Sequence, residues 1–98
     1  MPKVVKVENA KGMYVFDCPG CGFSHAIYVK GNNQGAQEWD FNFDYNFPTV
    51  NPSIRVRWTE GENRIEKCCH SFVIDGKIRF LNDCTHHLAG KTVELKDI

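Results

Sequence analysis

Two cysteines separated by two residues constrain this chain more than any other feature. Cys18 and Cys21 enclose Pro19 and Gly20 and are followed by Gly22. Two thiolates at this spacing can clamp one tetrahedral ion, and the glycines let backbone N–H groups turn toward the sulfurs. The same spacing also occurs in redox dithiols, but these need a helix after the first cysteine and a βαβ context, which this sequence lacks. The pair therefore indicates a metal site.

The length and the cysteine count agree with that interpretation. The chain has 98 residues and five cysteines, an odd number. No apolar run approaches the ~20 residues of a membrane span, and the N-terminus lacks the apolar segment of a signal peptide. We therefore expect a cytoplasmic protein without membrane partners, whose cysteines favour metal over disulfides. A chain this short forms one modest core, so we predict a single metal-stapled β domain over residues 1–98.

The charge balance bears on possible partners. Lys and Arg number 12 and Asp and Glu number 12, which gives a net charge of +0. A general polyanion binder carries a basic excess, so a nucleic-acid partner is not favoured. Four basic residues could still line one outer strip, but a solvated sheet face explains them equally well; they are Arg55, Arg57, Lys67 and Arg79.

Alternation of apolar and polar residues predicts a mostly β fold. We expect a small antiparallel sheet, similar to a zinc ribbon, with strands over residues 3–7, 12–17, 23–30, 38–45, 53–59 and 92–95 and a hairpin over residues 69–81. Asp83 is a good N-cap and Gly90 a good residue after a helix end. These two residues predict one short helical turn near residues 84–89.

The loop length of the hairpin over residues 69–81 determines which side chains share a face. A three-residue loop would pair Phe72 with Ile78 and collect the apolar side chains on one face. Cys69 and His70 then point to opposite faces of the strand, so one metal ion cannot easily take both.

We predict that the metal is zinc and that four side chains hold it. The predicted ligands are Cys18, Cys21, Cys69 and His86. His70 and Cys84 are the alternatives for the fourth place, and His25 is a weaker candidate. We also expect that one of the neighbours Cys68 and Cys69 is a small buried hydrophobe.

The segment from Cys69 to Gly90 resembles a family of small phage and prophage proteins of unknown function. The similarity extends to Cys18-Pro-Gly-Cys21, to Trp39 and to residues 48–53. Some members carry the label ammonia monooxygenase, which a small soluble chain does not support. The resemblance implies a phage origin, and hence a host cytoplasm, and a bound metal. It also favours Cys69 over Cys68 and His86 over Cys84 as ligands.

These observations favour a non-enzymatic protein with no catalytic residues, in which structural zinc supports binding of an unknown protein or small ligand. The first alternative is a zinc-dependent hydrolase with an open metal position and with Asp83, His70 or His87 as acid or base. The second alternative is a nucleic-acid-binding zinc-ribbon module. The third is an iron site with four thiolates, from Cys18, Cys21, Cys69 and Cys84.

Overall fold

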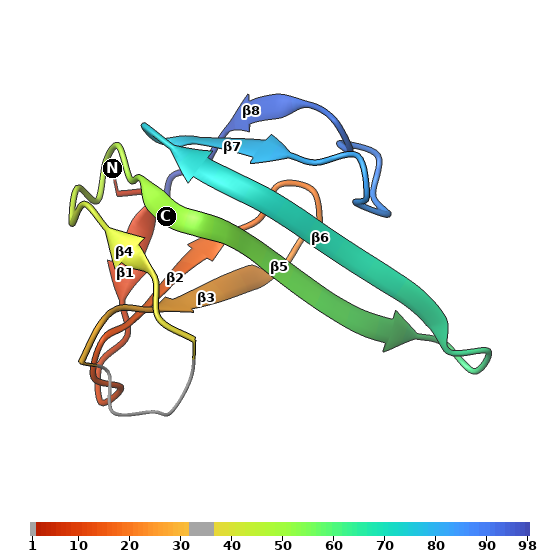
Figure 1. The fold of residues 1–98 in the computed structure, drawn as a ribbon, viewed down its shortest axis with the longest axis horizontal. Helices are drawn as coiled ribbons and strands as arrows, with labels where there is room; N and C mark the ends of the chain where they lie inside the picture. Colours follow the sequence, from red (N-terminus) through yellow and green to blue (C-terminus); the bar gives the residue numbers. More distant parts are fainter. Residues whose placement is uncertain (1, 32–36) are drawn as a thin grey trace.

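The computed structural model describes residues 2–31 and 37–98 and contains two antiparallel sheets (Figure 1). The small sheet has the order β1-β2-β3, with β1 (Val4–Lys6), β2 (Met13–Asp17) and β3 (Ser24–Tyr28). The large sheet has the order β4-β5-β6-β7-β8, with β4 (Asp40–Phe41), β5 (Val50–Glu60), β6 (Ile65–Ile74), β7 (Lys77–Phe80) and β8 (Thr92–Glu94). The predicted mostly β, antiparallel fold is confirmed.

The core contains side chains from both sheets. Alternating residues of β2 and β3 point inward, and Phe16 and Ile27 are fully buried. They belong to one apolar cluster with residues of the large sheet, namely Ile54, Cys69, Val73, Ile78 and Phe80. Because strand side chains alternate between faces, the intervening residues of the large sheet are left on an outer face.

The long hairpin of β5 and β6 carries that outer face. Arg55 lies opposite His70, and Val56 lies opposite Cys69. Ile54 is buried while Arg55 is exposed, as the alternation over residues 53–59 predicts. Cys69 therefore faces the core and His70 faces outward, which confirms that these neighbours serve opposite faces.

The register of the β6–β7 hairpin differs from the prediction. The loop is the two-residue turn Asp75–Gly76, and both of its residues have positive φ, 50° and 79°. Phe72 therefore lies opposite Arg79, and Val73 lies opposite Ile78. A two-residue turn with positive φ at both positions matches the twist of the flanking strands. The predicted three-residue loop, which paired Phe72 with Ile78, is wrong.

The strand predicted over residues 38–45 is much shorter than expected, because only Asp40–Phe41 pairs as β4. Side-chain oxygens of Asn42 and Asp44 accept backbone N–H groups nearby, at 2.9–3.1 Å. Such bonds offer the backbone an alternative to a ladder. Phe43 has a φ of 58° and is exposed, so the aromatic stripe does not continue as one buried face.

The segment near residues 84–89 forms hydrogen-bonded turns. The N–H of Ala89 donates to the carbonyl of His86 at 3.3 Å, and the N–H of Lys91 donates to that of Leu88 at 3.0 Å. No helix forms in the described ranges, so the expected helical turn is present only as these turns. The same ranges hold no helix that could cross a membrane.

Candidate active site and metal centre

Three polar side chains form a continuous hydrogen-bonded chain on the outer face of the large sheet. Ser53 Oγ lies 2.9 Å from His70 Nε2. On the other side of the ring, His70 Nδ1 lies 3.1 Å from Asp83 Oδ2. A hydroxyl, an imidazole and a carboxylate in this order have the connectivity of a serine-hydrolase triad.

Each member of the triad is placed by a different element. Ser53 lies in β5 between Val50 and Ile54, where the register with β6 shifts; such irregularities commonly redirect a side chain next to an active site. His70 lies in β6. Asp83 lies in the turn after β7. A hydrogen bond from the N–H of Leu81 to the carbonyl of His70, at 2.9 Å, connects the start of this turn to β6.

The triad lies near the surface. The His70 side chain is 22% exposed and that of Asp83 is 48% exposed. Water therefore screens the charge of Asp83, and its hydrogen bond acts mainly on the tautomer and the orientation of the imidazole. The indole Nε1–H of Trp39 donates to the carbonyl of Ser53 at 3.2 Å, which helps to hold the serine backbone in place.

A cluster of sulfur and nitrogen ligands lies on the core side of β6. The ligand atoms of Cys18, Cys21, His25 and Cys69 all lie within 4.8 Å of one another. A second group shares Cys69 and adds Cys84 and His86. Three thiolates and one imidazole form a common tetrahedral zinc site. The described residues thus bring together a group that can hold a metal ion.

The thiols of this cluster are strongly coupled. The Sγ atoms of Cys18 and Cys69 lie 3.9 Å apart. The hydrogen bond from the Cys69 thiol lowers the pKa of Cys18 to about 3, and the same interaction raises the pKa of Cys69. Burial, followed by the nearby Cys18 charge, raises the pKa of Cys21 to about 12. Cys18 is therefore the thiolate of the metal-free cluster, and a bound cation would favour the charged form of the others.

Two histidines compete for the fourth position. His25 is 3% exposed, and its Nε2 has no hydrogen-bond partner among the described residues. His86 Nε2 lies 3.5 Å from Cys69 Sγ, while its Nδ1 accepts the N–H of Leu88 at 3.2 Å. In a neutral ring only one nitrogen carries hydrogen. The bond from Leu88 therefore places the proton of His86 on Nε2, where it can donate to the sulfur.

Comparison with models of protein families assigns the chain to a family. Residues 2–81 match the model of a family described as bacterial ubiquitination-like system serine protease, BubE. The chain belongs to the BubE family. The matched range contains Ser53 and His70 and ends before Asp83. Neither a curated protein nor a solved structure matches the chain.

The structure of this BubE-family chain brings some of the predicted ligands together. Cys18, Cys21 and Cys69 share one group, and His86 lies beside Cys69. The choice of His86 as fourth ligand stays a prediction. His70 lies on the opposite face, within the triad.

The other two cysteines, Cys68 and Cys84, differ in burial and in their contacts. Cys84 Sγ lies 3.2 Å from both the backbone N and O of His70. Cys68 is only partly buried and lies opposite Arg57. Of the two neighbours, Cys69 is the one buried in the core, because alternation sends Cys68 to the outer face.

Local sequence patterns did not reveal the triad of this BubE-family chain. The sequence predicted Asp83 as a helix cap or as an acid or base of a zinc hydrolase, and His70 as a metal ligand or as such an acid or base. Ser53 was given no role. Seventeen positions separate Ser53 from His70, and 13 separate His70 from Asp83. No short motif contains these residues, so strand pairing was the missing information.

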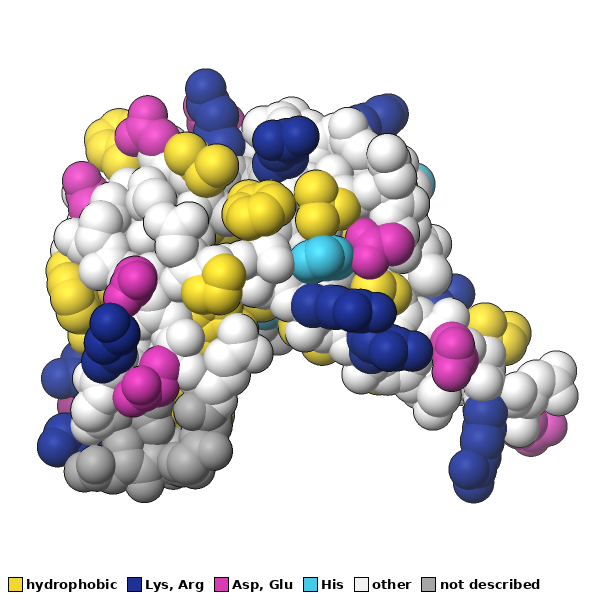
Figure 2. All heavy atoms as spheres, in the orientation of Figure 1, with side chains coloured by type: hydrophobic (Ala, Val, Ile, Leu, Met, Phe, Trp, Pro, Cys, Tyr) yellow, Lys and Arg dark blue, Asp and Glu magenta, His cyan; other side chains and the backbone are white. Residues whose placement is uncertain are grey.

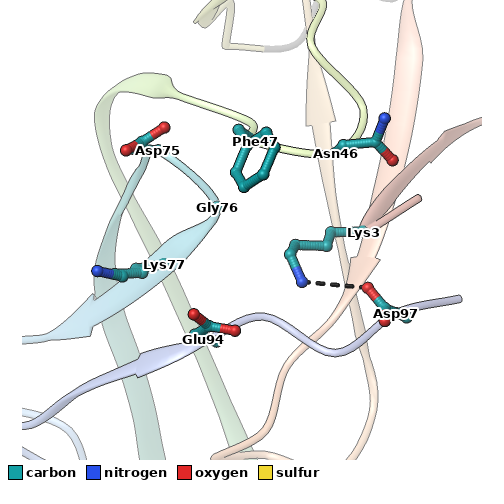
Figure 3. Close-up of a pocket in the computed structure, with 8 residues that line it drawn as sticks. All are labelled: Lys3, Asn46, Phe47, Asp75, Gly76, Lys77, Glu94 and Asp97. Carbon is teal, nitrogen blue, oxygen red and sulfur yellow. Dashed lines mark hydrogen bonds and ion pairs between the residues drawn. The ribbon is translucent and has the colours of Figure 1, made fainter. Parts of the chain in front are cut away.

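A surface cavity lies away from the triad residues. It has a volume of about 590 Å³ and is located at the Asp75–Gly76 turn (Figure 3). Lys3 and Asp97, two of its lining residues, form an ion pair in which Lys3 Nζ lies 3.1 Å from Asp97 Oδ1. None of the eight lining residues is a serine, cysteine or histidine. This cavity therefore offers neither a hydroxyl or thiol nucleophile nor an imidazole base.

Proposed function

We propose that this chain is a serine protease in which Ser53 is the nucleophile, His70 the general base and Asp83 the residue that orients the base. The observation that carries the proposal is the pair of hydrogen bonds on the two sides of His70, at 2.9 and 3.1 Å. The description of the BubE family as a serine protease supports the same activity.

The proposed reaction cleaves a peptide bond in two steps. Ser53 Oγ attacks the carbonyl carbon while its proton passes to His70 Nε2. The C–N bond then breaks, and His70 gives that proton to the leaving amine. A water molecule next attacks the acyl ester and gives a proton to His70, which returns it to Ser53 Oγ as the new carboxyl group leaves. Asp83 accepts the Nδ1–H bond throughout and stabilises the imidazolium form.

A fluorophosphonate probe tests the proposal directly, because it reacts covalently with an activated serine. The intact protein should take up one probe at Ser53, located by peptide mass spectrometry, and Ser53→Ala should lose labelling. Ser24→Ala is the matched control, since the Ser24 hydroxyl donates to the carboxylate of Asp17 at 2.8 Å, whereas that of Ser53 lies against the imidazole of His70. Equal labelling of the wild-type protein and Ser53→Ala would refute the proposal.

A structural zinc ion is the second part of the proposal. We propose that Cys18, Cys21 and Cys69 hold it and that His25 completes the shell in place of His86. The buried, unpartnered Nε2 of His25 supports this choice, as does the proton that Leu88 directs to His86 Nε2. Four protein ligands leave no open position on the ion, so the zinc would supply folding free energy rather than a bound nucleophile.

The family name also bears on the partner and the compartment. BubE proteins are described as parts of a bacterial ubiquitination-like system, so we propose that a protein of that system is the substrate. The five cysteines are free, which suits a reducing cytoplasm. Mass spectrometry of the system's purified proteins, before and after incubation with this chain, should show one Ser53-dependent cleavage. Unchanged masses throughout would contradict this choice of substrate.

A further inference from the structure

One edge of β5 is unpaired beside the triad. Within the described chain, β4 pairs only with Val50 and Asn51 of β5, whereas β6 occupies the opposite edge from Ile54 to Glu60. Residues 54–60 therefore present one edge without a strand partner, and that edge begins next to Ser53. Figure 2 shows that the molecule is hollowed below this part of the sheet, between the small-sheet side and the tip of the β5–β6 hairpin.

Two arginines of β5 lie on its outer face beside this edge. Arg55 and Arg57 are exposed there, and among the described residues neither makes an ion pair. Both line a surface cavity of about 220 Å³ whose wall also includes Asp83 of the triad. Figure 2 shows basic side chains on this face, above the hollow. An unpaired sheet edge can accept an added strand, and exposed charges beside it select the partner's side chains.

We propose that the substrate enters as an extended, acidic peptide segment that adds a strand to the free edge of β5. Its scissile carbonyl then lies beside Ser53, and its outward side chains lie beside Arg55 and Arg57. Because strand side chains alternate, every second residue of the segment faces the two arginines, and those positions carry Asp or Glu. This inference rests on the proposed protease function and adds the substrate class to it.

The charge preference is tested with a peptide pool prepared from a proteome digest, with cleavage sites mapped by mass spectrometry. The wild-type protein should cut peptides that carry Asp or Glu at alternate positions on one side of the cut. Arg55→Glu and Arg57→Glu should each lower kcat/KM for such a peptide by about tenfold. Arg79→Glu should leave it unchanged, because Arg79 is an exposed arginine of the same sheet but lies in β7, beyond β6.

The strand geometry is tested on the best-cleaved peptide by methylating its backbone nitrogens one at a time. Loss of a paired N–H should reduce cleavage by about tenfold or more at alternate residues only. A uniform response along the peptide would overturn strand addition, and unchanged kinetics in both arginine variants would overturn the acidic preference. If Ser53 reacts with the fluorophosphonate but no peptide in the pool is cut, the extended-peptide substrate is wrong while the triad stands. If Ser53 is not labelled, it is the protease function that has failed.

Discussion

Cys69 and His70 are consecutive residues of β6, yet one belongs to the metal group and the other to the triad. Cys69 is 1% exposed and faces the core, whereas His70 lies on the outer face between Ser53 and Asp83. Asp83 and Cys84 repeat this relationship, because Asp83 bonds the His70 ring whereas Cys84 belongs to the second ligand group with Cys69 and His86. The two sites therefore share backbone segments, and a metal that fixes one side of β6 also fixes the residues on its other side.

Metal removal should therefore disable the triad as well as destabilise the fold. We expect about one zinc per chain by atomic spectroscopy, and treatment with a strong chelator should lower the melting temperature sharply. Labelling of Ser53 should fall in parallel and return when zinc is added. A metal-free protein that melts at the same temperature would contradict the structural role, and full labelling of a chelated, destabilised protein would contradict the coupling.

The two neighbouring cysteines should respond differently to substitution. Cys69→Ser should lose zinc and destabilise the fold by roughly 4 kcal/mol or more, because the buried group loses a ligand. Cys68→Ser should keep zinc and change stability by less than about 1 kcal/mol, because Cys68 is only partly buried on the outer face. Zinc content and chemical denaturation of the two variants give the comparison. Zinc loss confined to Cys68→Ser would reverse the assignment of the ligand.

Substitution of each of the two histidines near the cluster should identify the fourth ligand. His25→Ala should lose most of the zinc, and His86→Ala should retain it with weaker affinity, because it removes only an N–H donor to Cys69. The opposite pattern would restore His86 as the ligand.

Gly20→Ala offers an independent test of the same point. A Cβ at Gly20 would meet the His86 ring at 2.4–2.7 Å and must displace it. We expect this variant to keep its zinc if His25 is the ligand and to lose it if His86 is. In the His86→Ala background the same change should have little further effect on melting, since the clashing ring is gone.

The carboxylate of the triad should matter for rate and not for folding. Asp83→Asn should lower kcat by about 10²-fold, at the lower end for a general-base system, because the half-exposed Asp83 is partly screened by water. Its melting temperature should stay within a few degrees of the wild type. Asp17→Asn is the control and should keep full activity, because Asp17 accepts a hydrogen bond from Ser24 and makes none with His70. A fully active Asp83→Asn would remove Asp83 from the site.

Trp39 should act as a positioning residue for Ser53. Trp39→Phe keeps an aromatic ring but deletes the N–H that donates to the Ser53 carbonyl at 3.2 Å. We expect kcat to fall several-fold with little change in KM, because the nucleophile loses its fixed backbone position. Phe23 lies 5.1 Å from Trp58 in a separate ring pair, so Trp58→Phe serves as the matched control. An equal effect in both variants would indicate general loss of packing.

The sequence by itself determined most of the strands and one half of the group that could hold a metal ion. Alternation over residues 53–59 separates Ile54 from Arg55, and alternation in β6 puts Cys69 and His70 on opposite faces whatever their partners are. The spacing of Cys18 and Cys21 marked one half of the metal group without any knowledge of the fold. These features depend on neighbours in the chain, and a local pattern is enough to predict them.

Tertiary structure alone decided which distant residues meet. Asp75 and Gly76 form a two-residue turn with positive φ at both positions, so Phe72 lies opposite Arg79. The pairing of Phe72 with Ile78, which the apolar pattern predicted, does not form. The irregular start of β5 and the turn after β7 then brought Ser53 and Asp83 to the two nitrogens of His70. Sequence spacing cannot predict such a site, because strand registers and turn geometry combine to place it, and a one-residue slip in either would send the side chains to the wrong face.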